Sequence, residues 1–162
     1  MAAVDYFLKI DGIPGESTDA KHTGEIDLEA FSWGATNAGA PPGGPGGGSG
    51  KVSLEDFHFT TRVNKASPQL FLACATGKHI KQAIFTARKA GKAQQEFLVY
   101  KFTDVLITSY QIGGSEAGDE LPMDQISFDF ARIDYEYRPQ KPDGSLGPPV
   151  KAGWDVKTNK PA

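Results

Sequence analysis

The chain has one cysteine, Cys74, among its 162 residues, so an internal disulfide framework is excluded and folding in a reducing compartment is expected. The opening residues, MAAVDYFLKIDG, lack the basic segment and the long apolar core of a secretory signal peptide. No apolar run approaches the roughly 20 residues that a membrane-spanning helix needs. We therefore expect synthesis in the cytoplasm and no insertion into a membrane.

A large excess of charge of either sign is also missing. The formal net charge is −3, which predicts no nucleic-acid partner. The most basic run, RKAGK at residues 88–92, has the composition of a turn, and we interpret it as a solvated hairpin tip. The length of the chain fits a single domain spanning residues 1–162.

Glycine and proline are concentrated in one stretch. Between Gly39 and Gly50 every residue is Gly, Pro, Ala or Ser. Such a stretch is typical of a domain linker, a phosphate-binding loop, or an arm that becomes ordered against a partner. The Gly-Lys pairs at residues 50–51 and 77–78 lack the upstream glycine and the following Ser or Thr of a phosphate-binding loop. Strand patterns of one fold lie on both sides of this stretch, which argues against a linker between domains. We therefore predict an extended loop over residues 38–50.

Alternation of apolar and polar residues predicts strands over most of the chain, beginning with residues 4–10 and ending with residues 150–156. In residues 25–34, 52–59 and 126–137 the apolar positions switch from one parity to the other partway along. A side-chain period of two changes phase only at a bulge or a strong bend, or where both faces are covered. We therefore predict a mainly β fold, a closed or strongly curved antiparallel β-barrel.

The longest strand pattern covers residues 96–112 and is apolar on both faces. A strand in a simple barrel needs only one apolar face, the one that enters the core. The second face must therefore contact a helix or another subunit.

One flanking α-helix is predicted over about residues 68–76. Ser67 is suited to the N-cap, Pro68 to the first helical position, and Gly77 to the C-terminal cap. A helix this short is not stable alone, so it must pack on the sheet. The face predicted to enter the core carries Leu70, Phe71 and Cys74.

The sequence shows no pattern typical of a catalytic or metal site. GGSEA, at residues 113–117, places Ser115 in a near match to a nucleophile elbow, but Ala117 replaces the last glycine and no helix is predicted to follow. Cys74 is expected in the core, which argues against a nucleophile activated by the nearby His79. The three histidines lack the spacing of a zinc site. We therefore expect no enzyme activity, no metal and no cofactor.

Two other interpretations stay open at this point. Phe31, Trp33 or Trp154 could stack on a sugar or another ligand, as in a carbohydrate- or ligand-binding β module, although aromatic residues in strands belong to the core more often. A hydrolase built on Ser115 or Cys74 is the third interpretation. The surplus of apolar strand face and the extended loop favour an assembling protein over both.

Six segments, in order along nearly the whole chain, resemble the Hcp family, the hemolysin-coregulated proteins that form the inner tube of the bacterial type VI secretion system. The segments are FLKIDGIPGES, EIDLEAFSWG, SPQLFLACATGKH, VYKFTDVLITSYQIGG, FARIDYEYRPQKPDG and GWDVKTN. The resemblance implies a β-barrel with a flanking helix, assembled as a homo-hexameric ring that stacks into a hollow tube. It also implies sheath and spike proteins as partners, effectors in the lumen, no cofactor, and secretion without a signal peptide.

The resemblance also assigns roles to individual residues. The serine of the family's FSWG-like motif lies on the lumen-facing surface, which implies that Ser32 contacts effector cargo. The extended loop after this motif reaches toward the neighbouring ring, which implies a role in ring stacking for residues 38–50. The candidate stacking residues are Ala38, Gly39, Pro41, Pro42, Pro45 and Gly50.

Overall fold

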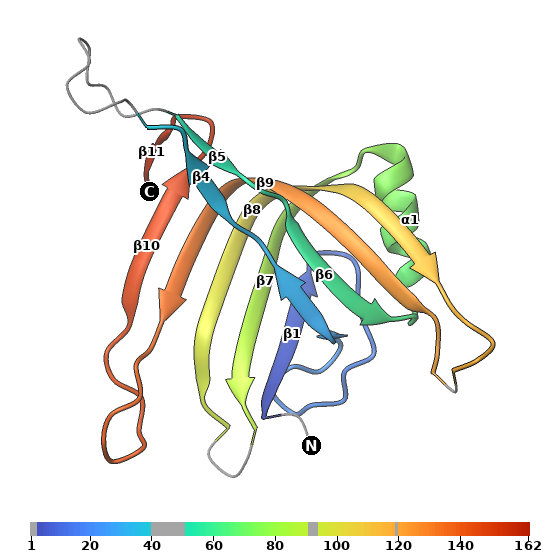
Figure 1. Cartoon of the computed structure of the whole chain (residues 1–162), viewed down its shortest axis with the longest axis horizontal. Helices are drawn as coiled ribbons and strands as arrows, with labels where there is room; N and C mark the ends of the chain where they lie inside the picture. Colours follow the sequence, from blue (N-terminus) through green and yellow to red (C-terminus); the bar gives the residue numbers. More distant parts are fainter. Residues whose placement is uncertain (1–2, 40–50, 91–93, 119) are drawn as a thin grey trace.

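The structure is a computed structural model, and it describes residues 3–39, 51–90, 94–118 and 120–162. Within these residues the protein is mainly β, with a helix at one side of a strongly curved sheet (Figure 1). The elements are β1 (Val4–Ile10), β2 (Ile26–Leu28), β3 (Ala30–Ser32), β4 (Ala35–Asn37), β5 (Val52–Leu54), β6 (Phe57–Arg62), α1 (Ser67–Thr76), β7 (His79–Lys89), β8 (Glu96–Gly113), β9 (Met123–Tyr137), β10 (Val150–Asp155) and β11 (Lys160–Pro161).

The described strands pair antiparallel throughout, and β9 connects the two parts of the main sheet. One path runs in the order β11-β10-β9-β8-β7-β1-β2, while β9 also pairs with β6, and β6 pairs with β3. The first half of β9 contacts β6 and the second half contacts β10. β4 and β5 form a separate two-stranded hairpin, which extends from the main sheet on the same side as the C terminus (Figure 1).

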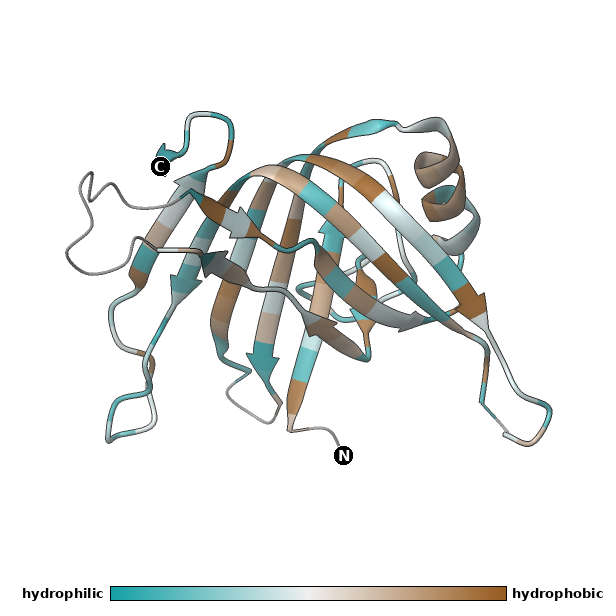
Figure 2. Cartoon of the chain, turned by 45° about the horizontal axis from the view of Figure 1, so that its top comes forward, coloured by the Kyte–Doolittle hydropathy of each residue, from teal (hydrophilic) through white to brown (hydrophobic). Residues whose placement is uncertain are grey.

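The long strands β8 and β9 switch the face that enters the core, and they do so at the same level. Buried Phe102 on β8 pairs with buried Ile133 on β9, and buried Val105 pairs with buried Phe130. Asp104, between the two β8 residues, has a φ of 54°, in the left-handed region that non-glycine residues seldom adopt. Hydropathy alternates along both strands (Figure 2). The change of phase predicted within residues 126–137 is confirmed.

In residues 25–34 the strand is interrupted at the point where the sequence predicted a change of phase. β2 ends before Glu29, and β3 then continues with Phe31 packed against the core and Ser32 exposed. β2 pairs with β1, whereas β3 pairs with β6, so the hydrogen-bonded path of the described strands does not close on itself. The predicted strong curvature is present, and the predicted closed barrel is not confirmed.

The helix α1 has the predicted ends but a different N-cap. Ala66 precedes the first turn and offers no side-chain cap, whereas Ser67 lies inside the helix and is buried. The Oδ1 atom of Asn64 accepts a hydrogen bond from the Ala66 N–H at 2.9 Å, so a side chain three positions before the predicted cap fixes the entry to the helix. Pro68 lies in the first turn, and Gly77 ends the helix with a φ of 64°.

The buried face of α1 is also shifted from the predicted one. Leu70 and Ala73 are buried, Cys74 is half-buried, and Phe71 is 56% exposed. The prediction that Phe71 enters the core is wrong, because one residue along a helix turns the side chain by about 100° from the face that Leu70 occupies. The Phe71 ring instead contacts Tyr110 of β8, with ring centroids 6.0 Å apart. Tyr110 pairs with buried Ile126 and packs against the core, so the helix covers the end of the core face of β8 and not a second apolar face. No helix in the described part of the chain is long and apolar enough to cross a membrane.

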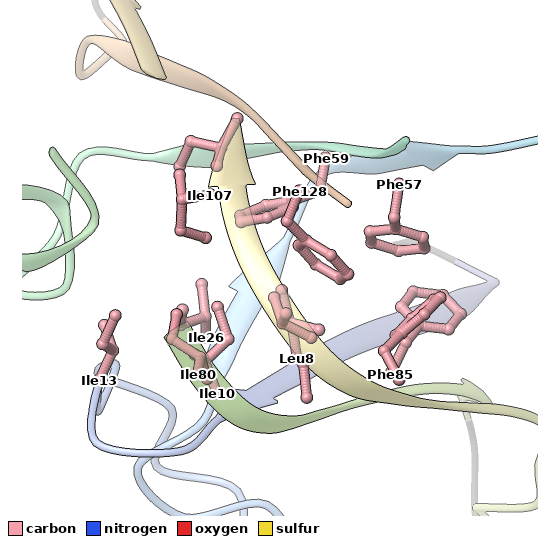
Figure 3. Close-up of a cluster of buried hydrophobic side chains, with 14 of the residues drawn as sticks. Leu8, Ile10, Ile13, Ile26, Phe57, Phe59, Ile80, Phe85, Ile107 and Phe128 are labelled. Atoms are coloured by element: carbon pink, nitrogen blue, oxygen red, sulfur yellow. The ribbon is translucent and has the colours of Figure 1, made fainter. Parts of the chain in front are cut away.

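The core has an aromatic end and an aliphatic end. Phe57 of β6 lies with its ring centroid 5.0 Å from Phe102, 5.1 Å from Phe128 and 5.5 Å from Phe85. Isoleucine side chains gather at the other end (Figure 3). Contacts between rings from four neighbouring strands add to the stabilisation from buried apolar area. Together they stabilise the curved shape of the sheet.

Candidate assembly and cargo surfaces

Ser32 begins a row of polar residues that crosses the main sheet. Its partner on β6 is His58, the partner of His58 on β9 is Ser127, and Ser127 is paired with Ser109 on β8. Because side chains alternate along a strand, residues two positions away share the same face. They form a second row of Ala30, Thr60, Gln125 and Gln111.

These two rows line a shallow depression with a volume of about 600 Å³. Its polar groups are hydroxyls, side-chain amides and one imidazole. Among the described residues no Asp, Glu, Lys or Arg lines it, although charged residues make up 23% of the chain. The Nδ1 atom of His58 lies 2.5 Å from the Ser127 hydroxyl oxygen. Ser32 is exposed at one side of the depression, so its side chain lies outside the core.

The aromatic residues considered as a stacking surface pack against other rings or the core. The Phe31 ring lies 4.4 Å from the Phe85 ring, and the Trp33 ring lies 5.4 Å from the Tyr100 ring, measured between centroids. Trp154 is half-buried and packs against the core cluster. These contacts do not favour the interpretation of the chain as a carbohydrate- or ligand-binding module.

The β4–β5 hairpin is the stem of the predicted extended loop. Asn37 at the end of β4 pairs with Val52 at the start of β5. Ala38 and Gly39 follow the stem and are exposed, and the Gly39 N–H donates a hydrogen bond to the Asn37 Oδ1 atom at 2.9 Å. Four stacking candidates lie outside the described residues, namely Pro41, Pro42, Pro45 and Gly50.

Large apolar side chains are exposed in two groups, which lie toward opposite ends of β9 (Figure 1). Exposed apolar groups are typical of protein interfaces. The first group, called the helix–hairpin surface here, lies on α1 and the β8–β9 hairpin and consists of Phe71, Leu72, Ile112 and Leu121, which are 52–58% exposed. The second group, the β9–β10 surface, consists of Tyr135, Tyr137 and Val150, which are 38–65% exposed.

Arg88 is buried, with 3% of its surface exposed, so the interpretation of residues 88–92 as a solvated tip is wrong for this residue. Its Nη1 and Nη2 atoms donate to the two carboxylate oxygens of Asp19 at 2.9 and 2.8 Å, and Nη2 also contacts Asp5 at 3.3 Å. The guanidinium lies 4.8 Å from the centroid of the Phe7 ring. The hydrogen bond from Arg88 lowers the pKa of Asp19 from 3.8 to about 2.

His22 joins the same cluster from the loop between β1 and β2. Its ring stacks on Phe7 with centroids 4.2 Å apart. Its Nδ1 atom lies 2.9 Å from Glu25 and its Nε2 atom 2.6 Å from Glu96 on β8. The contacts of His22 and Asp19 therefore fix this loop to β7 and β8.

Among the residues with described positions, no group of three or more His, Cys, Asp and Glu could hold a metal ion.

The residues considered as nucleophiles lie apart from one another. Ser115 is in an exposed turn, where its hydroxyl oxygen accepts a hydrogen bond from the Ala117 N–H at 3.3 Å, and Cys74 is half-buried on α1. The Ser–His hydrogen bond that the structure does contain joins Ser127 to His58, 69 positions away. No pattern in the sequence predicted this pair, because only the register between β6 and β9 brings the two residues together.

Three comparisons with known proteins agree with one another. The family described as "Type VI secretion system effector, Hcp" matches residues 7–137. The chain is 44% identical over 159 residues to Protein hcp1 of Pseudomonas aeruginosa, which covers 97% of this chain and 98% of that protein.

Two solved structures give the same result for the fold. The crystal structure of Hcp1 from Salmonella typhimurium superposes with a TM-score of 0.82 at 36% identity, covering 99% of this chain and 100% of that one. The structure of a type six secretion system protein gives a TM-score of 0.93 at 32% identity, with the same coverage. The chain therefore belongs to the Hcp family of type VI secretion proteins, and it is a structural subunit of the type VI secretion tube.

Proposed function

We propose that six copies of this chain close into a ring, and that the rings stack into a hollow tube that a contracting sheath expels with a spike at its tip. The observation that carries this proposal is the pair of exposed apolar surfaces. The helix–hairpin surface and the β9–β10 surface differ from each other and lie toward opposite ends of β9. A head-to-tail contact between two different surfaces forms a ring when its rotation closes, and it removes apolar side chains from water.

We also infer that the curved sheet is closed into a barrel through Glu29. The Glu29 N–H donates to the carbonyl oxygen of Thr60 on β6 at 2.8 Å. The Thr61 hydroxyl donates to the carbonyl oxygen of Asp27 on β2 at 2.8 Å. These bonds connect β2 and the break after it to β6, on the open side of the strand path. They support one barrel-like domain over residues 1–162, from which the loop of residues 38–50 extends.

Within this assembly Ser32 faces the lumen and contacts effector proteins, while residues 38–50 reach toward the next ring. The exposure of Ser32 supports the first role. The second is supported by the β4–β5 hairpin, which pairs separately from the main sheet and leads into the loop through the exposed residues Ala38 and Gly39. The chain needs no catalytic group for this work, since a tube subunit acts through its shape and its contacts.

Sedimentation of the purified protein tests the proposal most directly, combined with negative-stain imaging of the same sample. The expected particle has six times the 17.4 kDa mass of the chain and the outline of a ring. A chain that stays monomeric at high concentration contradicts the proposal and favours the ligand-binding module instead.

A further inference from the structure

Ser32 is one corner of a larger surface that can form hydrogen bonds without carrying charge. We propose that the two polar rows around His58 and Gln125 hold the cargo, and that they recognise an uncharged cargo segment rich in amide and hydroxyl groups. This inference rests on the proposed tube function, and it names the chemistry of the partner and further residues that select it.

The strand register places these residues within reach of one cargo segment. His58 is directly beside Ser32, and Gln125 is beside Thr60 in the next row. Neighbouring strands lie about 4.8 Å apart, so a row across four strands spans roughly 15 Å. An extended segment of about five residues covers this distance at roughly 3.3 Å per residue. A cargo segment that contacts Ser32 along its row therefore also contacts His58.

The polar side chains of the depression have hydrogen-bonding capacity left for a ligand. Ser127 contacts the Nδ1 atom of His58, whereas the Nε2 atom of this exposed ring has no partner among the residues that the structure places. The side chains of Ser32, Thr60 and Gln125 also have no hydrogen-bond partner among the residues that the structure places. A glutamine amide offers both donors and acceptors, and a hydroxyl offers one donor and an acceptor oxygen. These groups match amides and hydroxyls of a partner.

The absence of charge in the lining decides which partner fits. Moving an unpaired charge out of water costs far more than moving a neutral group that regains its hydrogen bonds. On the strands that line the depression, charged residues lie at its borders. Asp129 lies two positions beyond Ser127 on β9, and Arg62, which pairs with Glu29 at 3.1 Å, lies two positions beyond Thr60 on β6. A charged cargo segment would therefore be excluded from the centre of the depression.

Three peptides of about eight residues test this selection, a length sufficient to span the rows at roughly 3.3 Å per residue. One consists of Ser, Thr, Asn and Gln, and the other two carry lysines or glutamates in place of some of these. Calorimetry with the assembled protein should show binding of the neutral peptide, and binding of the two charged ones weakened by about tenfold or more. His58→Leu should weaken binding of the neutral peptide by about tenfold.

Charge substitutions at Gln125 provide the sharper test. Gln125→Lys should shift the preference to the glutamate peptide, and Gln125→Glu should shift it to the lysine peptide. Gln69→Lys is the matched control, because Gln69 is an exposed glutamine on α1 that does not line the depression. An equal shift in the control, an unchanged preference in the Gln125 variants, or no binding of any peptide overturns the inference.

Sedimentation of the same samples separates this inference from the proposed function. The rows lie within one chain, so the ranking of the peptides can be measured in a monomer as well as in a ring. Wild-type protein that stays monomeric but ranks the peptides as expected contradicts the ring and supports the selection. Rings that bind the three peptides equally contradict the selection and leave the ring intact.

Discussion

The hydroxyl of Ser67 on α1 donates a hydrogen bond to the carboxylate of Asp124 on β9, a side chain that is fully buried. The other oxygen of this carboxylate accepts a hydrogen bond from the Tyr110 hydroxyl on β8 at 3.0 Å. Burial and this contact with Asp124 raise the pKa of Tyr110. A polar contact, in addition to the packing of Leu70 and Ala73, therefore fixes the helix to the sheet.

Ser67→Ala should lower the free energy of unfolding by about 1–3 kcal/mol, because it leaves one oxygen of the buried Asp124 carboxylate without its donor. Denaturant unfolding at a fixed protein concentration measures the loss. Ser145→Ala is the matched control, since it removes a 2.6 Å hydrogen bond to Asp143 at the surface and should cost less than about 0.5 kcal/mol. Equal losses in the two variants would contradict a special role for the buried contact.

Stability should fall in acid as Asp19 is protonated. The hydrogen bond from Arg88 lowers the pKa of Asp19 from 3.8 to about 2 in the folded chain. The ion pair therefore contributes its full stabilisation above pH 4 and loses it as the pH falls toward 2. In Asp19→Asn, unfolding should depend less steeply on pH across this window, and stability at pH 7 should be lower. Asp11→Asn, at an exposed carboxylate away from Arg88, should leave the slope unchanged.

Sequence patterns predicted the parts of this fold that local chemistry determines. Pro68 and Gly77 mark the ends of α1 because each has its own backbone preference. The error at Phe71 has a different cause, since tertiary packing chooses which face of a short helix is buried. Long-range strand register is the other source of error. It places His58 beside Ser32 and Ser127, and no local pattern in the sequence encodes that register.

Phe71→Asp should give folded chains that no longer form rings. The side chain is 56% exposed in the single chain and lies on the helix–hairpin surface, where the proposed contact would bury an unpaired carboxylate at a cost of several kcal/mol. Sedimentation should show monomers, while circular dichroism keeps the β signal. Gln69→Asp on the same helix is the control and should still assemble. Rings formed by Phe71→Asp would place the subunit contact elsewhere.

Cys74→Ser and Ser115→Ala should leave ring formation and secretion unchanged. Cys74 is half-buried on α1, and the Ser115 hydroxyl accepts a hydrogen bond from the backbone of its own turn. Both substitutions keep the shape of the side chain nearly constant, so a structural subunit tolerates them. An activity that hydrolyses a test ester in the wild type and disappears in either variant would show that the chain is an enzyme after all.

Replacing residues 40–50 with two residues, which leaves a five-residue loop between β4 and β5, should separate ring formation from ring stacking. β4 and β5 pair with each other and not with the main sheet, and Asn37 faces Val52 at the end of this stem, so a short turn can close the hairpin without moving the core. The ring contacts proposed here lie on α1, the β8–β9 hairpin, β9 and β10, and hexamers should therefore persist. Stacked tubes and secretion should be lost, because six loops acting together turn weak contacts into a stable junction between rings. As a control, replacing residues 40–50 with a Gly-Ser segment of equal length separates the effect of sequence from that of length. Normal stacking and secretion of the shortened chain would show that the loop only connects two strands.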